Sequence, residues 1–117
     1  MGNLKEGTLE IIVNEGDKII IEWLGRSENR EPSALLNPYF KDIVENASGK
    51  EVEVDFTKLE YMNSSTVPPI IHMIKNLDTK GISTKIYYNK DSKWQAASFK
   101  ALETISNSLN SIEVLGK

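Results

Sequence analysis

Three hydroxyl side chains, Ser64, Ser65 and Thr66, stand in a row directly after Asn63. We expect a strand to end and a helix to begin at this point, and the free N–H groups at a helix start stabilise an added anion. Phosphorylation of one hydroxyl would add a charge of about −1.5 to −2 and three acceptor oxygens. Capping of the helix needs only one such residue. The residues alone therefore support simple capping and a phosphorylation switch about equally.

The rest of the sequence offers little to catalysis. His72 is the single histidine, and it lies within the predicted helix, away from its apolar stripe. A metal site needs several converging ligands, so we predict neither a metal nor a catalytic role for this residue. Glu53 and Asp55 occupy the polar positions of an alternating strand, where charges are solvated. With no glycine-rich phosphate loop and no G-x-S-x-G motif, we predict that the chain is not an enzyme and has no cofactor.

Size and charge narrow the class of protein further. The 117 residues fit one domain over residues 1–117, and the absence of cysteine rules out disulfides. The net charge is −3 and the basic residues are scattered, so we predict no nucleic-acid partner. No window approaches about 18 apolar residues, and the N-terminus is polar, so we predict no membrane span and no signal peptide. We therefore expect a cytoplasmic protein.

Segments rich in β-branched residues alternate with amphipathic segments, which predicts an α/β fold. Residues 8–13 and 18–24 predict a hairpin because they flank the turn sequence Asn-Glu-Gly-Asp. Asn37-Pro38 marks either a kink in the first helix or its true start. The later elements are expected at 33–47 (helix), 52–56 (strand), 66–79 (helix), 82–89 (strand), 92–109 (helix) and 112–115 (strand). The order β-β-α-β-α-β-α-β predicts a mostly parallel central sheet with an antiparallel N-terminal hairpin and helices packed on it.

The helix after the hydroxyl row has an apolar and a polar side. Pro68 and Pro69 fit only its first turn, which places the N-cap near Ser65 or Thr66. The predicted core stripe consists of Val67, Ile70, Ile71, Ile74 and Leu77, and that of the last helix of Ala97, Ala101, Ile105 and Leu109. The remaining surface predicts a protein-binding face, made up of Asn63, Ser65, Thr66, Pro68, Pro69, His72, Met73 and Asn76. The alternative is a solvated face with incidental prolines.

The segment Asp55–Ser65, with the sequence DFTKLEYMNSS, resembles the signature of STAS domains, which occur in anti-sigma factor antagonists. That signature has an aspartate where this chain has Asn63, and a glycine where it has Thr66. At both positions this chain is similar to the SiaC-type regulatory phosphoproteins, whose motif is Tyr-Phe-Asn-Thr-Ser-Ser. The sequence Gly-Arg-Ser at 25–27 is also similar to the N-terminal region of that family. The resemblance implies a STAS-like single domain, closest to the SiaC-type proteins.

The resemblance also implies a partner-switching regulator. In both families the phosphorylated hydroxyl falls on the position of Ser64, with Ser65 and Thr66 as alternatives here. We expect those two to cap the first turn, which leaves the Ser64 hydroxyl free. The unmodified form would bind a protein partner, either a GHKL-type serine kinase that is also an anti-sigma factor or another signalling enzyme, and a PP2C-type phosphatase would remove the phosphate. The alternative is a STAS-like domain without a switch, acting as a constitutive subunit or small-ligand binder.

Overall fold

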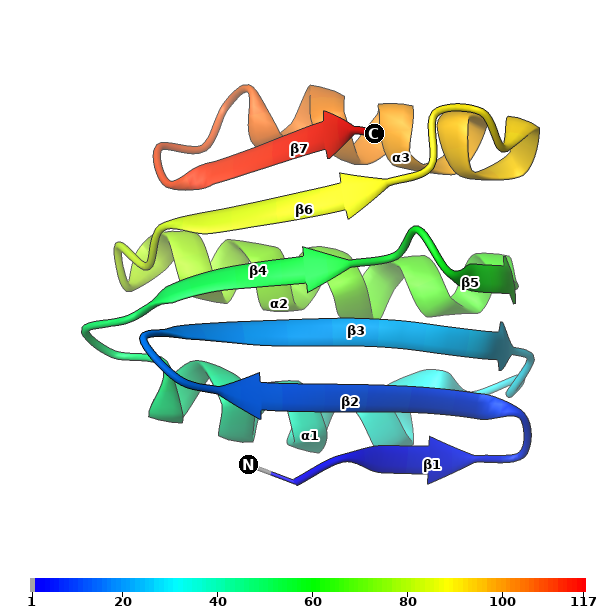
Figure 1. The fold of residues 1–117 in the computed structure, drawn as a ribbon, viewed down its shortest axis with the longest axis horizontal. Helices are drawn as coiled ribbons and strands as arrows, with labels where there is room; N and C mark the ends of the chain where they lie inside the picture. Colours follow the sequence, from blue (N-terminus) through cyan, green and yellow to red (C-terminus); the bar gives the residue numbers. More distant parts are fainter. Residues whose placement is uncertain (1) are drawn as a thin grey trace.

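The computed structural model describes residues 2–117 and contains a seven-stranded sheet with three helices (Figure 1). The elements are β1 (Leu4–Glu6), β2 (Leu9–Glu15), β3 (Lys18–Ser27), α1 (Pro32–Asn46), β4 (Glu51–Asp55), β5 (Leu59–Met62), the short 3₁₀ turn η1 (Ser64–Thr66), α2 (Val67–Thr79), β6 (Thr84–Tyr88), α3 (Lys93–Ser106) and β7 (Ile112–Gly116). The strands lie in the order β1-β2-β3-β4-β6-β7, and β5 pairs with the end of β3. β1, β2 and β3 are antiparallel, whereas β4, β5, β6 and β7 continue the sheet in parallel.

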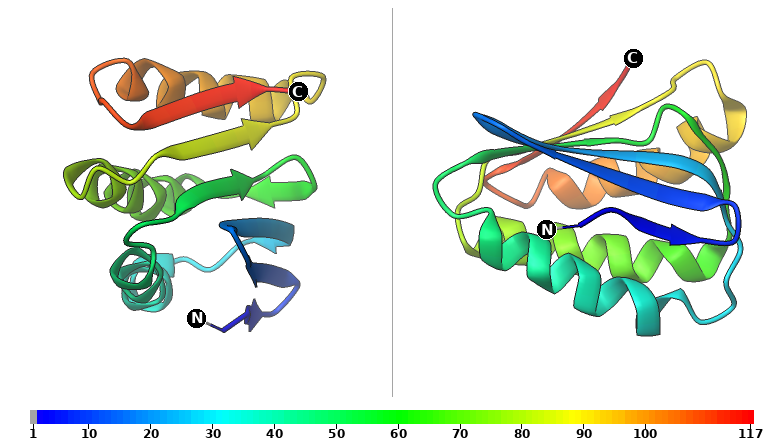
Figure 2. Two further views of the ribbon diagram at one scale, coloured as in Figure 1. Left: turned by 60° about the vertical axis from the view of Figure 1, so that its left-hand side comes forward. Right: turned by 60° about the horizontal axis from the view of Figure 1, so that its bottom comes forward.

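All three helices cover the same face of the sheet. The parallel strands β3, β4, β6 and β7 occupy neighbouring positions in the order in which they occur along the chain. Right-handed crossovers that always step in the same direction place every connecting helix on one face. Figure 2 shows this layer of helices beneath the sheet and the opposite face uncovered. As a result α1 and α2 lie side by side and run in the same direction, opposite to the strands.

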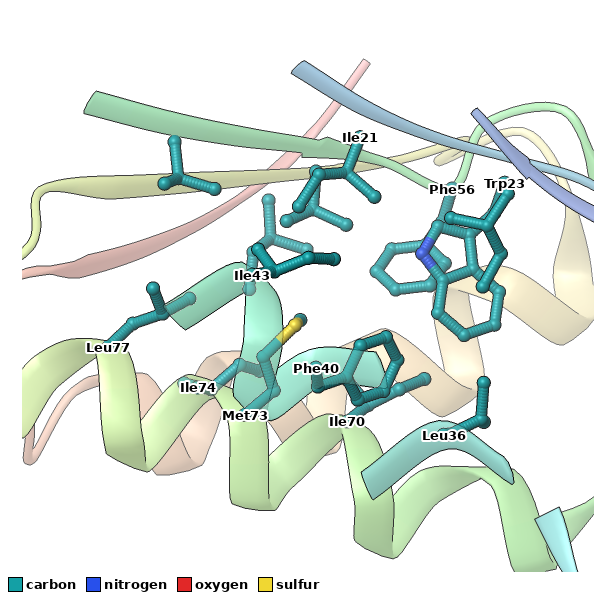
Figure 3. Close-up of a cluster of buried hydrophobic side chains, with 14 of the residues drawn as sticks. Ile21, Trp23, Leu36, Phe40, Ile43, Phe56, Ile70, Met73, Ile74 and Leu77 are labelled. Carbon is teal, nitrogen blue, oxygen red and sulfur yellow. The ribbon is translucent and has the colours of Figure 1, made fainter. Parts of the chain in front are cut away.

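The apolar core fills the space between the sheet and the helices (Figure 3). Trp23 of β3 is fully buried in it, with ring centroids 5.8 Å from Phe40 of α1 and 4.9 Å from Phe56 after β4. Phe56 in turn contacts Phe99 of α3 at 4.7 Å. Aromatic pairs at these separations add to the large burial of each ring. These aromatic contacts therefore connect α1 and α3 to the middle of the sheet.

The predicted order of elements is confirmed, and the structure adds two short strands. β1 and β5 have three and four residues, which is too short for an alternating pattern to stand out. β3 continues to Ser27 instead of ending at Leu24, because Gly25 takes a φ of 80° that allows a bulge in the strand. The first helix starts at Pro32 and contains Pro38, so the later start at Asn37 is wrong.

The inward face of α3 also differs from the prediction. Phe99 and Leu102 are buried, together with Gln95 and Ser106, whereas Ala97 and Ala101 are exposed. A Phe or Leu side chain removes far more apolar surface from water than an alanine methyl group does. The helix is therefore oriented with its two large apolar residues, and not its alanines, toward the core.

Candidate functional site

The hydroxyl row follows β5, which the fold holds beside the end of β3. Within β3, residues 18–22 pair with β4, and residues 25–27 pair with β5. The backbone N–H of Asn63 then donates to the carbonyl of Ser27 over 3.0 Å. The row thus begins where two parallel strands end together, at the amino end of α2.

A buried glutamine holds the turn that leads into β5. The Gln95 side-chain amide donates to the carbonyls of Phe56 and Leu59 at 2.8 and 2.9 Å, and its oxygen accepts from the Asn89 N–H at 2.8 Å. Gln95 is 1% exposed, so these bonds lie in a dry environment where unpaired groups would be costly. α3 therefore fixes the position of the strand that carries the site.

Asn63 is the residue that organises the turn after β5. Its Oδ1 accepts from the Thr66 backbone N–H at 3.1 Å and from the Thr66 hydroxyl at 2.7 Å. Its Nδ2 donates to the carbonyl of Asn29, in the loop after β3, at 2.8 Å. Asparagine is a preferred N-cap residue, and here it closes η1 directly before α2. The side chain thereby joins three segments, namely β5, η1 and the loop after β3.

Thr66 is fully buried, contrary to its predicted place on the binding face. Its hydroxyl lies 2.7 Å from that of Ser27, and since the Thr66 hydrogen points to Asn63, Ser27 donates to Thr66. Thr66 is the N-cap of α2 but makes no side-chain cap hydrogen bond. The predicted N-cap position near Ser65 or Thr66 is therefore confirmed, but the Thr66 side chain does not cap the helix. Its predicted places in partner contact and as an alternative phosphoacceptor are wrong, because its hydroxyl is enclosed.

Ser64 and Ser65 are both exposed. Within residues 2–117 neither hydroxyl forms a side-chain hydrogen bond, so each is free to react. The expected cap by Ser65 is wrong, because the amide of Asn63 already serves the first free N–H group. The Asn-x-x-Thr spacing could have indicated this, since asparagine ranks with serine among N-cap residues. The structure leaves both Ser64 and Ser65 exposed, and the sequence resemblance favours Ser64.

The predicted binding face on α2 is narrower than expected. Pro68 and His72 are exposed, and Asn76 is partly exposed one turn further along the same ridge. Pro69 is buried and Met73 is 1% exposed, so their predicted places on the face are wrong. Residues four apart lie on the same side of a helix, so Pro69 and Met73 face the same way, and both pack with the core stripe. The exposed surface consists of Ser64, Ser65, Pro68 and His72, edged by Asn63 and Asn76.

Two hollows border this ridge. The larger, with a volume of about 620 Å³, lies between α1 and α2 and is lined by Asn37, Pro38, Phe40, Lys41, Val44, Glu45, His72, Asn76, Thr79 and Lys80. The smaller, of about 460 Å³, lies between the start of α1 and the start of α2 and is lined by Arg30, Glu31, Pro32, Ser33, Ala34, Ser65 and Pro68. The ridge of α2 thus forms one wall of each hollow.

An exposed aromatic residue precedes the hydroxyl row in the chain. Tyr61 of β5 is 39% exposed, and the Arg26 guanidinium stands 4.7 Å from its ring centroid. Arg26 also forms a salt bridge with Glu28. Both ion-pair partners are about half exposed, so the bridge adds little stability, but it orders the cation over the ring. In the sequence, the signals for this cluster were the Gly-Arg-Ser sequence at 25–27 and the tyrosine of the segment Asp55–Ser65.

Within residues 2–117 no group of three or more His, Cys, Asp or Glu side chains could hold a metal ion. None of the three helices in that range is long and apolar enough to cross a membrane.

The comparisons with known proteins identify the class of fold. No protein-family model matches the sequence, and no curated protein matches it. Solved structures do match, and they place the chain in the STAS-like α/β class, with the fold of the anti-sigma factor antagonist SpoIIAA in its unphosphorylated form (TM-score 0.61, 11% identity, 93% of this chain and 88% of that chain). The predicted STAS-like fold is therefore confirmed.

Among individual proteins, the structure is similar to SiaC of Pseudomonas aeruginosa. The match to the complex of the diguanylate cyclase SiaD with its activator SiaC has a TM-score of 0.68 at 16% identity and covers 98% of both chains. SiaC itself matches with a TM-score of 0.59 at 17% identity over the whole of both chains. At these identities the comparison establishes a shared fold, as the sequence resemblance predicted.

Proposed function

We propose that this protein is a phosphorylation-switched protein-binding regulator and not an enzyme. In the unmodified form, the exposed ridge from Ser64 to Asn76 binds a signalling protein, and phosphorylation of Ser64 weakens that contact. The observation that carries the proposal is the state of the Ser64 hydroxyl, which is exposed and makes no side-chain hydrogen bond within residues 2–117. The side chains of Asn63 and Thr66, by contrast, are held by hydrogen bonds in the turn. A phosphate can therefore be added without disturbing the network that shapes the turn.

The effect of the phosphate follows from its charge. A group of charge about −1.5 to −2 that is pressed into a docked, partly dry interface loses water without gaining a partner cation. Arg26 is already paired with Glu28 and stacked on Tyr61. Arg30 lines the smaller hollow with Ser65, but its single charge would offset only part of the charge of a phosphate. A penalty of about 3 kcal/mol changes affinity by more than a hundredfold, which is enough to exchange one partner for another.

The structural neighbours support a partner in signalling. SiaC is the activator of a diguanylate cyclase, and SpoIIAA is an anti-sigma factor antagonist. For this chain we infer a GHKL-type serine kinase or another signalling enzyme as the partner, and a PP2C-type phosphatase that restores the unmodified form. Such a cycle operates in the cytoplasm, where ATP is available, and involves neither nucleic acid nor membrane.

The proposal is tested with ATP and the GHKL-type kinase encoded nearest to this gene. We expect intact mass spectrometry to show one added phosphoryl group, and peptide mapping to place it on Ser64. Ser64→Ala should abolish the modification and bind the kinase constitutively, whereas Ser65→Ala should behave as the wild type. A modification confined to Ser65 would refute the choice of residue. No modification, with binding intact, would favour the alternative of a constitutive subunit without a switch.

A further inference from the structure

We propose that the groove between α1 and α2 receives an amphipathic α-helix of the protein partner, with acidic side chains along its edges. This inference rests on the proposed function, because it assumes that a protein binds the ridge of α2. It adds a second wall to the interface, namely the exposed side of α1, which the sequence did not single out.

The dimensions of the groove suit two turns of a helix. Its walls run over residues 37–45 of α1 and 72–80 of α2, and nine helical residues span roughly 13 Å. The two helices are side by side and parallel, so the walls stay together along this length (Figure 2). Phe40 and Val44 form an apolar floor, at 2% and 3% exposure, and Pro38 adds an exposed ring at one end. A third helix can pack on two others in this way, with its apolar side chains in the groove.

The need to pair the buried backbone N–H and C=O groups of the occupant favours a helix over an extended peptide. Both walls are helices, whose interior N–H and C=O groups are already paired along the helix. An extended segment in the groove would find no strand edge to pair with, and its buried backbone groups would remain unsatisfied. A helical segment satisfies its own backbone and presents only side chains.

The charges on the two walls indicate an acidic occupant. Lys41 stands halfway along the α1 wall and Lys80 at the end of the α2 wall, and both are exposed. Neither forms a salt bridge within residues 2–117, nor does Glu45, the single acid on the walls. The walls therefore carry one more positive than negative charge, and carboxylates placed opposite the two lysines would complement them.

The groove is continuous with the switch. His72 and Asn76 belong both to the exposed ridge and to the wall of the groove, and Ser64 lies at the amino end of the same helix. A helix that fills the groove therefore reaches toward the start of α2, where a phosphate on Ser64 would meet the rest of the partner.

Site-specific photo-cross-linking in the host cell distinguishes this inference from the proposed function. We would place p-benzoylphenylalanine at Lys41 in the α1 wall, at Pro68 on the ridge, and at Lys100, exposed on α3, as the control. We expect Lys41 and Pro68 to cross-link to the same partner and Lys100 not to. The peptide linked at Lys41 should have apolar residues at helical spacing and acidic residues beside them. Links from Pro68 alone would refute the groove and leave the proposed function standing. Links from Lys41 alone would refute Pro68 as part of the binding surface and place the partner in the groove alone.

The linked peptide, made synthetically, is then titrated into the full chain by calorimetry. Lys41→Glu combined with Lys80→Glu should weaken binding about tenfold at low salt and less at high salt, because the pairs are exposed. Lys93→Glu combined with Lys100→Glu, both exposed on α3, makes the same charge change outside the groove and should leave the affinity unchanged. The proposal is overturned if the double variant binds as the wild type does, if circular dichroism shows no helix in the bound peptide, or if the peptide comes from a second copy of this chain.

Discussion

Replacing Asn63 by alanine should destabilise the fold, whereas the same replacement at the adjacent Ser64 should not. The Asn63 side chain makes three hydrogen bonds, with the Thr66 N–H, the Thr66 hydroxyl and the Asn29 carbonyl. Each is worth about 1 kcal/mol net. The Thr66 N–H keeps a second bond to the Asn63 carbonyl, so its loss is partial. We therefore expect Asn63→Ala to lower the free energy of unfolding by about 2–3 kcal/mol.

A third variant separates the two ends of the Asn63 amide. Asn63→Asp keeps an acceptor for Thr66 and places a negative charge near the start of α2, which is favourable by about 0.3–1 kcal/mol. It also replaces the Nδ2 donor by an oxygen that faces the Asn29 carbonyl, now 2.8 Å away. The repulsion outweighs the gain, and we expect a loss of about 1–2 kcal/mol, between those of the alanine variant and the wild type.

Urea unfolding, followed by tryptophan fluorescence from the buried Trp23 and the partly buried Trp94, measures all three variants. Ser64→Ala is the matched control, because it truncates a neighbouring side chain without a hydrogen bond and should stay within about 0.5 kcal/mol of the wild type. In thermal unfolding, Asn63→Ala should melt about 10 °C lower. Equal losses for Asn63→Ala and Ser64→Ala would refute the assignment of the network to Asn63, and so would an aspartate variant as stable as the wild type.

Three further predictions follow from individual contacts. Gly25→Ala should cost about 3 kcal/mol or more in urea unfolding, because its φ is 80° and an added Cβ would lie 1.8 Å from the Thr8 carbonyl oxygen. Met73→Ala should cost about 2–5 kcal/mol by the same assay, whereas the exposed neighbour His72→Ala should be neutral, which tests the corrected phase of α2. Burial raises the pKa of Tyr39 from 10.0 to about 12. Stability should therefore be unaffected by this group below pH 10 and should fall between pH 10 and about pH 12, where only the unfolded chain has ionised; absorbance titration of wild type and Tyr39→Phe checks the pKa.

The fold was largely predictable because its strands and helices differ in period and length. Alternation in β4 and the β-branched runs of β2 and β3 are strong signals, and the order of elements then limits the topology. β5 was missed because it has only four residues and its pairing depends on the register shift beside Gly25 in β3. That interaction joins residues more than thirty positions apart, and no local pattern indicates it.

The candidate site was predictable in position but not in detail. The exposure of Ser64 and His72 agrees with the prediction, because both lie outside any apolar periodicity. Met73 and Thr66 were misplaced for different reasons. Adjacent helical residues differ by about 100° in direction, so a small error in phase moves a methionine from the surface to the core. The burial of Thr66 depends on Ser27, which comes from a distant strand.

Under the proposed switch, Asn63 stabilises the turn and Ser64 carries the phosphate. This separation determines whether the phosphate changes the stability of the free protein or its affinity for the partner. The network of Asn63, Thr66 and Ser27 holds the turn without the Ser64 hydroxyl. A phosphate on Ser64 therefore changes the stability of the free protein little and acts on the bound state, as a difference in affinity. Such coupling is reciprocal, since the free energies around the cycle must sum to zero. A partner that binds the unmodified form a hundredfold more tightly must, when saturating, shift the phosphorylation equilibrium of Ser64 by the same factor toward the free hydroxyl.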